Sequence, residues 1–366
     1  MRLACLVSGG VDSSVALALA KDSGCEVHAF YLKIWLEEET SFLGECPWEN
    51  DLQFVRSVCE TLDVPLTVVS LQKEYHSRVI SYALQEVRQG RTPNPDMMCN
   101  ALIKFGAFQE WLEEQGEAFE KIVTGHYAQS GEYRDSQGVI IPIMRLAKDR
   151  VKDQTYFLSR LSKPQLKKTW FPLGEYEKFE VRALAKKKGF LTFDRPDSQG
   201  LCFLGKIRYA DFIKHHLGEW PGDIVESSTG SILGKHQGHW FYTIGQRHGL
   251  DLSGGPWYVV GKDTKNNNVL VSHRLKMPQI ERDSFQVENA SWFLDEKDFR
   301  ELFFTKKLFC KVRHGEKMYE VKLKPTSKDL SSFDVRILEE KERGITPGQF
   351  AVFYGDDICL GSGIIQ

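Results

Sequence analysis

The first 130 residues alternate between apolar strand-like runs and helix-length segments, and this alternation constrains the fold more than any other feature of the sequence. The strand-like runs cover residues 2–7, 26–35, 65–71 and 119–128, and helical spacing occupies residues 15–24, 50–63 and 75–90. Strands that alternate with helices of this length form parallel βαβ units, with helices on both faces of one sheet. We therefore expect an α/β fold with a doubly wound parallel sheet, whose ligand binds at the carboxyl ends of the strands.

The rest of the chain has a different pattern. Residues 131–146 predict a hairpin, and residues 163–190 predict a basic helical region. After about residue 205, short strands rich in Gly, Trp and Tyr predict a small β module, and a further β-rich block from about residue 280 predicts a sandwich or a barrel. We place the domains at residues 1–204, 205–278 and 279–366.

Composition excludes several classes of protein. The net charge is −2, so any polyanion must be bound by local basic patches. No apolar run reaches the ~20 residues that span a bilayer, and the N-terminus lacks the features of a signal peptide. We therefore expect a cytoplasmic protein, with import into an organelle as the alternative. The eight cysteines include no C-x-x-C pair, which argues against a zinc ribbon and favours reduced, mostly buried thiols; we expect no resident metal site.

A glycine–serine turn joins the first strand to the first helix, in the run CLVSGGVDSSVALALA at residues 5–20. Gly9 and Gly10 let the main chain approach a ligand, and the N–H groups at a helix N-terminus bind anions, usually phosphate. The turn lacks the lysine of the common nucleotide loop, so we expect a pyrophosphate held mainly by neutral donors. Asp12 could hold Mg²⁺ against it. The alternative is that Asp12 or a serine simply caps the helix.

A second unusual segment is TPNPDMMCN at residues 92–100. Its two prolines force an extended chain, and we expect Asp96 to cap the helix that follows. Cys99 would then lie in the first turn, where a helix N-terminus lowers the pKa of a thiol and favours the reactive thiolate. An ordinary buried cysteine is the alternative.

Cys202 lies in the segment DRPDSQGLCFLGK at residues 194–206. Loops on a rigid scaffold often carry function, although LCFLG could instead form a short buried strand. Seven segments together resemble, in the same order, the tRNA-uridine 2-sulfurtransferase family of the PP-loop ATP pyrophosphatase superfamily. They are SGGVDSS, TPNPDMMCN, VTGHYA, KDQTYFL, DSQGLCF, YTIGQRHGL and TPGQFAVFYGDDICLGSGII.

The resemblance covers nearly the whole chain and implies a PP-loop catalytic domain, a central β-rich domain that contacts tRNA, and a C-terminal β-barrel. It implies ATP-dependent conversion of the wobble uridine to 2-thiouridine, with release of AMP and pyrophosphate. ATP and Mg²⁺ are the implied cofactors. The implied partners are the anticodon stem-loop of tRNA and a protein that donates persulfide sulfur.

The resemblance also implies roles for individual residues. Cys99 is the implied nucleophile, Cys202 the carrier of the persulfide, and Asp96 a proton shuttle that also contacts the target base. The implied ATP-binding residues are Val7, Ser8, Gly9, Gly10, Val11, Asp12, Ser13, Ser14, Leu32 and Gly125. The implied contacts to the target uridine or to tRNA are Asn94, Pro95, Asp96, His126, Lys152, Asp153, Gln154, Arg313, His314 and Gln349.

The chemistry explains why such groups are needed. The C2 oxygen of uridine is a poor leaving group, and adenylation converts it into AMP, which leaves readily. We expect the Cys202 persulfide to attack C2 directly or to be released first as sulfide, after which a Cys99–Cys202 disulfide remains. Proton transfer by Asp96 is consistent with its position three residues before Cys99.

Recognition of a wobble base requires a splayed anticodon loop, and local basic clusters could track its phosphates. The clusters are Lys163, Lys167 and Lys168; Lys186, Lys187 and Lys188; and Lys306, Lys307, Lys311 and Arg313. Each run taken alone is more typical of a solvated face, and a lone histidine such as His126 is more often structural. Two other functions remain open from the residues: an amidating or lysine-ligating PP-loop synthetase, and a non-catalytic nucleotide-sensing RNA-binding protein.

Overall fold

The computed structural model describes residues 1–34, 47–134, 138–197, 209–273, 282–294, 307–338, 341–342 and 344–366. Its first domain contains a five-stranded parallel sheet in the order β3-β2-β1-β4-β7. The strands are β1 Arg2–Leu6, β2 Glu26–Lys33, β3 Leu66–Ser70, β4 Lys121–Val123 and β7 Thr169–Trp170. The chain moves outward from β1 to β3 and then returns to the other side at β4. This reversal creates a switch point between the carboxyl ends of β1 and β4.

Helices cover both faces of the sheet, which confirms the doubly wound prediction. One face carries α1 (Val11–Asp22), α3 (Pro47–Leu62) and α10 (Lys178–Lys187), which share an apolar core with the strands. A second core covers the other face. It includes α5 (Ser81–Arg88), α6 (Pro95–Cys99), α7 (Phe108–Glu114) and two π-helical segments, η1 (His76–Ile80) and η2 (Asn100–Ala107).

The basic region at residues 163–190 is helical only in part, so that prediction is wrong between its two helices. The helix α9 (Lys163–Lys167) ends before β7, and α10 begins at Lys178. β7 pairs with β4 and completes the sheet. A two-residue strand is too short to give a periodic signal, which is why the sequence pattern missed it.

The C-terminal β-rich block is a closed barrel, which decides between the sandwich and the barrel. Its strands follow the order β12-β15-β14-β13-β16-β17, and pairing of β12 with β17 closes it. They are β12 Ser284–Trp292, β13 Leu308–Lys311, β14 Tyr319–Pro325, β15 Phe333–Ile337, β16 Phe350–Gly355 and β17 Ile358–Ile365. Closure removes the exposed sheet edges that a small open sheet would leave.

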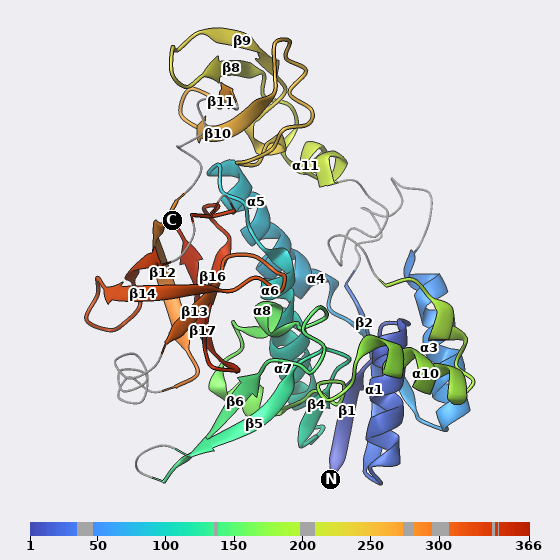
Figure 1. Ribbon diagram of the computed structural model, residues 1–366. Coiled ribbons are helices and arrows are strands. Elements are labelled where there is room, and N and C mark those ends of the chain that lie inside the picture. Colours follow the sequence, from blue (N-terminus) through green and yellow to red (C-terminus); the bar gives the residue numbers. More distant parts are fainter. Residues whose placement is uncertain are drawn as a thin grey trace.

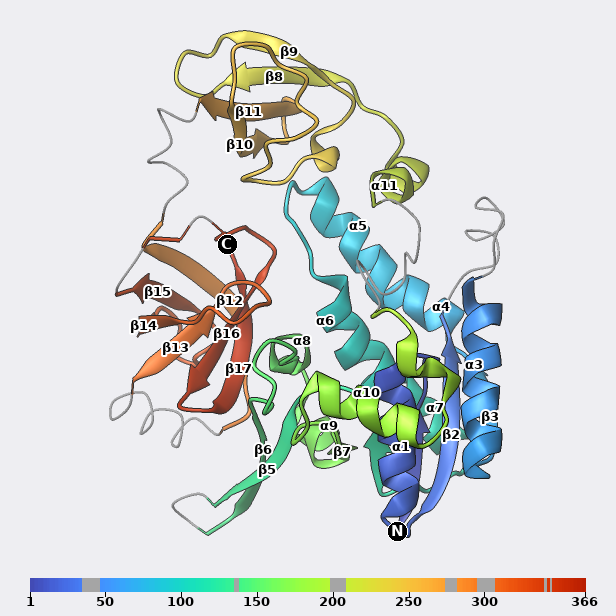
Figure 2. The same cartoon turned by 45° about the vertical axis from the view of Figure 1, so that its right-hand side comes forward.

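The predicted hairpin is present as β5 (Gln129–Arg134) and β6 (Ile140–Arg145), but it extends the barrel sheet rather than the parallel sheet. β6 pairs with β17, with Met144 opposite Cys359 (Figure 2). A segment of the first 204 residues is therefore built into the C-terminal sheet. The exact domain boundaries stay a prediction.

The central module is a four-stranded sheet, in the order β10-β11-β8-β9, with its own small apolar core. Its elements are α11 Tyr209–Leu217, β8 Gly222–Glu226, β9 Ile232–His236, η4 His239–Phe241, β10 Trp257–Asp263 and β11 Asn268–His273. The module lies at the end of α5, where His239 Nε2 is 3.2 Å from the carbonyl oxygen of Arg88 (Figure 1). In the described part of the chain, no helix has the length and apolar character needed to cross a membrane.

A buried ion pair joins the first domain to the barrel. Lys311 Nζ on β13 lies 3.0 Å from Asp153 Oδ2, and both side chains are almost fully buried. The same carboxylate accepts hydrogen bonds from the Thr155 hydroxyl and from the backbone N–H of Ala147. These extra donors satisfy the carboxylate, which is what makes a buried pair tolerable.

We expect Lys311→Met to destabilise the barrel by about 3–5 kcal/mol, because the Asp153 carboxylate is then left buried without its counter-ion. Urea unfolding followed by tryptophan fluorescence measures this loss. Lys307→Met is the control, since the Lys307–Glu320 pair has an exposed lysine and should contribute less than about 1 kcal/mol. Equal losses in the two variants would contradict the role given to the buried pair.

Candidate functional site

The glycine–serine turn lies at the switch point, between the end of β1 and the N-terminus of α1. Gly9 has φ +78°, a conformation that glycine adopts without strain, and Gly10 caps α1 with no side-chain hydrogen bond. Neither Asp12 nor a serine is the cap. The first N–H groups of α1 have no intrahelical acceptor and are therefore suited to an anion.

The serines of the turn hold its backbone. Ser13 Oγ accepts from the backbone N–H of Ser8 at 3.1 Å and donates to the Gly10 carbonyl at 3.0 Å. Ser14 Oγ donates to the same carbonyl at 2.9 Å, and Thr192 on η3 (Leu191–Asp194) donates to Ser14 Oγ. The hydroxyl groups thus fix the loop conformation that presents the N–H groups.

The glycine–serine turn itself contains no lysine, but a lysine from a distant part of the chain lies beside it. Lys178, at the start of α10, places its Nζ 2.7 and 2.8 Å from the two carboxylate oxygens of Asp12. The Tyr127 hydroxyl also donates to Asp12, at 2.9 Å. The expectation that mainly neutral donors surround this turn must therefore be corrected. Nothing in the local sequence around Lys178 points to this role.

Asp197 is the second carboxylate that holds Lys178, at 2.8 Å. It also receives Lys152 at 2.7 Å and Arg182 at 2.9 Å. Burial raises the pKa of Asp197, but hydrogen bonds from Lys152 and Lys178 outweigh it and bring the pKa down to about 2. Asp197 therefore remains ionised at neutral pH and binds three cations.

Arg195 holds the outer side of the turn. Its guanidinium donates to the Gly9 carbonyl at 2.7 Å and to Asp51 at 2.6 Å. A Cβ on Gly9 would lie 2.7 Å from the Asp51 carbonyl oxygen, so a larger residue does not fit there. The quoted segment DRPDSQGLCFLGK includes both Arg195 and Asp197, and it was the one sequence signal for this cluster.

Gly125 and His126 follow β4 on the other side of the switch point. A Cβ on Gly125 would lie 2.7 Å from the backbone of Asp12 and Ser13, so glycine is required for this close approach. The His126 ring is 2.8 Å from the Thr124 hydroxyl, and burial, with a smaller effect of the Lys104 charge, lowers its pKa well below the ordinary value. His126 is therefore neutral, which suits base or aromatic contact better than phosphate.

Cys99 does not have the environment expected of it. The helix cap is Asn94, whose side chain accepts from Met97 N at 3.3 Å, so Cys99 is the fifth residue of α6 and lies beyond the first turn. Its side chain is 3% exposed. Burial raises its pKa to about 11, Lys104 opposes that shift, and Asp96 adds to it. The prediction of a lowered pKa is wrong for this conformation, because burial outweighs the helix end.

The residues expected to meet tRNA gather where α6, α8 (Thr155–Leu158) and the barrel meet. Gln349 donates to the carbonyls of Thr92 and Pro93 and accepts from Asn94. His314 Nε2 is 3.1 Å from the Asp153 carbonyl, and its ring lies 4.7 Å from that of Phe157.

The other residues that are expected to contact tRNA lie in different surroundings. Gln154 exchanges hydrogen bonds with the backbone of Tyr127, and Lys152 pairs with Asp197. Arg313 is 65% exposed and lies 3.4 Å from Glu342. Asp153 is buried in its ion pair, so its side chain faces the protein rather than solvent. Their contacts with tRNA stay predictions.

Some predicted residues lie elsewhere. Val7 and Val11 are core residues beside the turn, Pro95 is the buried first residue of α6, and Leu32 packs at the carboxyl end of β2. Cys202 and Lys306 lie outside the described residues. Within the described ranges, no group of three or more His, Cys, Asp or Glu side chains is arranged to hold a metal ion.

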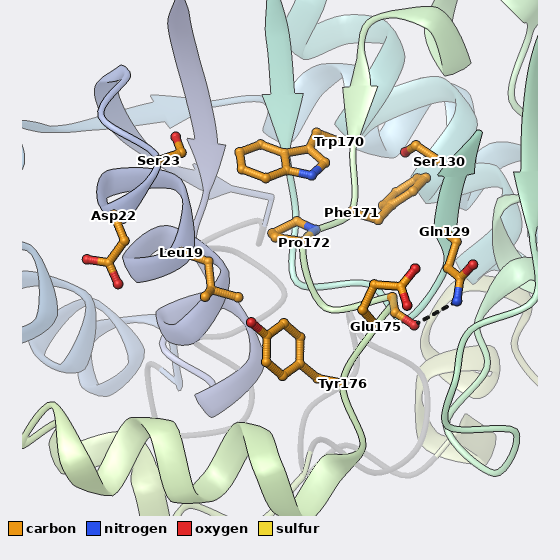
Figure 3. A pocket seen from close by; sticks show the side chains of 11 residues that line it. Leu19, Asp22, Ser23, Gln129, Ser130, Trp170, Phe171, Pro172, Glu175 and Tyr176 are labelled. Atoms are coloured by element: carbon orange, nitrogen blue, oxygen red, sulfur yellow. Dashed lines mark hydrogen bonds between the residues drawn. The ribbon is translucent and has the colours of Figure 1, made fainter. Parts of the chain in front are cut away.

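A pocket of about 510 Å³ lies at the other end of α1, away from the glycine turn. Figure 3 shows Leu19 of α1 on one side of it and Trp170, Pro172 and Tyr176 on the other. None of its lining residues belongs to the predicted site. It therefore adds nothing to the chemistry described above.

Comparison with known proteins gives a consistent result along the whole chain. Family models match for a tRNA methyl transferase HUP domain at residues 1–206, a tRNA methyl transferase PRC-barrel domain at 210–273 and an aminomethyltransferase beta-barrel domain at 282–365. The tRNA-specific 2-thiouridylase MnmA of Parabacteroides distasonis is 42% identical over 367 residues, and that of Porphyromonas gingivalis 43% over 388 residues. Each match covers 100% of this chain and 99% of the relative.

The fraction of Cys99 that is ionised to the thiolate can be measured through its rate of alkylation. Because its pKa is about 11, alkylation by iodoacetamide should rise about tenfold per pH unit between pH 7 and pH 10. Mass spectrometry of the peptide that contains Cys99, in the protein without RNA, measures the rate. A rate that is already maximal at pH 7 would show that the helix end, not burial, controls this thiol.

Proposed function

This chain belongs to the tRNA-specific 2-thiouridylase family, and we propose that it adenylates the C2 oxygen of the wobble uridine with ATP and replaces it with sulfur. As a member of this family it is a tRNA sulfurtransferase.

The Lys178 bridge is the observation that carries the proposal. One ammonium group contacts Asp12 at the phosphate-binding turn and Asp197, which precedes Cys202 by five residues. Five residues of chain span at most about 18 Å. The covalent length of the chain therefore limits how far the sulfur chemistry can lie from Asp197, and we propose that it takes place close to the nucleotide.

The turn suits the polyphosphate of ATP. The N–H groups at the start of α1 favour negative charge, and so does the Lys178 ammonium, which contacts Asp12 in the first turn of that helix. Asp12 would be the carboxylate that holds Mg²⁺, since this ion needs only one or two protein carboxylates when phosphates supply other ligands. Bound Mg²⁺ would neutralise charge on the phosphates. Gly125 lets β4 approach the backbone of Asp12 and Ser13 at the turn, and the neutral His126 ring follows it.

Adenylation makes the exchange of oxygen for sulfur feasible. The C2 oxygen attacks the α-phosphorus and pyrophosphate leaves with the bonding electron pair. The outer sulfur of a Cys202 persulfide then adds at C2 and AMP departs. In the alternative route, Cys99 first attacks the inner sulfur, which forms the disulfide and releases the outer sulfur as sulfide, and this sulfide adds at C2. In the direct route, Cys99 attacks the inner sulfur of Cys202, the sulfur on C2 keeps the electron pair, and both cysteines become a disulfide.

Cys99 must change its surroundings before it reacts. It is buried, and its pKa of about 11 keeps it a thiol at neutral pH. Movement at the joint of α6 and α8 would expose it beside the half-buried Asp96, which we propose shuttles its proton. Burial in the absence of RNA would protect the thiol from oxidation. A persulfide-carrying protein is the proposed sulfur donor.

Cys202→Ser should separate the two half-reactions. With ATP and an anticodon stem-loop, the variant should still release AMP, because adenylation does not use sulfur, but it should form no 2-thiouridine. Thin-layer chromatography for AMP and nucleoside mass spectrometry for the product measure the two steps. Normal thiolation by this variant would contradict the scheme.

Lys178→Met should raise the KM for ATP about 10- to 100-fold, because a charge-assisted hydrogen bond contributes about 1.5–3 kcal/mol. The KM for RNA should change little. Lys187→Met on the exposed side of the same helix is the matched control. If Lys178→Met lowers only the melting temperature and leaves the KM for ATP unchanged, Lys178 serves as a structural bridge alone.

A further inference from the structure

Asn100 carries a buried hydrogen-bond acceptor without a partner in the described part of the chain. Its side chain is 3% exposed, and its Nδ2 donates to the carbonyl of Phe157 at 3.1 Å. Its Oδ1 has no hydrogen-bond partner. The contact with Phe157 fixes the orientation of the amide, because a reversed amide would set two acceptors against each other.

A buried acceptor without a partner is costly and uncommon, so it needs an explanation. Asn100 also begins the π-helical segment η2, and such segments occur frequently at functional sites. The unpaired side-chain oxygen and the start of the π-helical segment are therefore two independent features that both indicate Asn100.

The position of Asn100 connects it with the predicted uridine site. It follows Cys99 directly, and α6 packs against α8, which carries Phe157. The Phe157 ring contacts His314, and the α6 cap Asn94 contacts Gln349. Asn100 thus lies among the residues that are predicted to receive the base.

Uracil offers a matching donor next to the reacting atom. N3 carries a hydrogen in uridine and is bonded to C2, the atom that sulfur attacks. In cytidine, N3 is instead an acceptor. An acceptor placed beside the cysteine that completes the sulfur transfer would therefore face N3 and favour uridine.

We propose that Asn100 Oδ1 accepts the N3–H of the target uridine and so selects uridine over cytidine. This inference rests on the proposed function. Both Asn100 and Cys99 are buried, so the movement that brings the base to the sulfur must also uncover the amide. The unpaired oxygen is satisfied only when the base is present.

The test uses two anticodon stem-loops that differ at the target base, one with uridine and one with 3-deazauridine, which has C–H in place of N3–H. Because leaving a buried acceptor unpaired costs about 1–3 kcal/mol, the wild type should bind the uridine stem-loop about 5- to 150-fold more tightly. Fluorescence anisotropy with the intact chain measures both affinities.

Asn100→Leu, which keeps a similar shape without polar atoms, should bind the two stem-loops equally. Ser159→Ala is the control, because it removes another buried polar group, one residue beyond α8, whose hydroxyl donates to the Tyr156 carbonyl. It should keep the wild-type preference.

Equal binding of both stem-loops by the wild type overturns the inference, even if Asn100→Leu fails to fold. So does a preference that survives in a folded Asn100→Leu protein, which would leave a trapped water as the partner of Oδ1. If the wild type releases AMP with the uridine stem-loop yet shows no preference, only the role of Asn100 fails. If it releases no AMP, the proposed function itself fails.

Discussion

One ammonium group, that of Lys178, connects the start of α1 with the chain that leads toward Cys202. A cation beside a helix N-terminus is unfavourable by itself, because the helix dipole is positive there. Two carboxylates, Asp12 and Asp197, hold it in place. A polyphosphate at the turn would compete with both for the same ammonium, so nucleotide binding and the anchoring of Asp197 are electrostatically linked.

The sequence was sufficient for features that depend on local patterning. Alternating strands and helices predicted the doubly wound sheet, and the glycine–serine turn lies at the switch point of that sheet. Features that depend on distant residues were missed. Lys178 is 166 positions from Asp12, and the barrel closes only because β12 pairs with β17 at the far end of the domain. No local window contains such information.

Cys99 illustrates the limit of local reasoning about chemistry. The argument from a helix end predicted a lowered pKa, but the true cap lies two residues earlier, at Asn94, and the side chain is buried. Burial depends on α8 and the barrel, which are contributed by later parts of the chain. The same holds for Asp153, which the resemblance implies as a tRNA contact and which is the buried partner of Lys311.

The hairpin β5–β6 leaves the first domain and pairs with the last strand of the protein, Met144 opposite Cys359. The segment that leads from the hairpin to α8 is therefore attached to the barrel twice, through β6 and through Asp153, and between these two points Lys152 attaches it to Asp197. A cut near residue 279 would separate two linear pieces, but it would also remove the β6 partners of Ile358 and Cys359 on β17 and leave β6 as an open edge of the hairpin. The domain boundary near residue 279 that the sequence pattern predicts therefore does not divide the folded molecule into two self-contained parts.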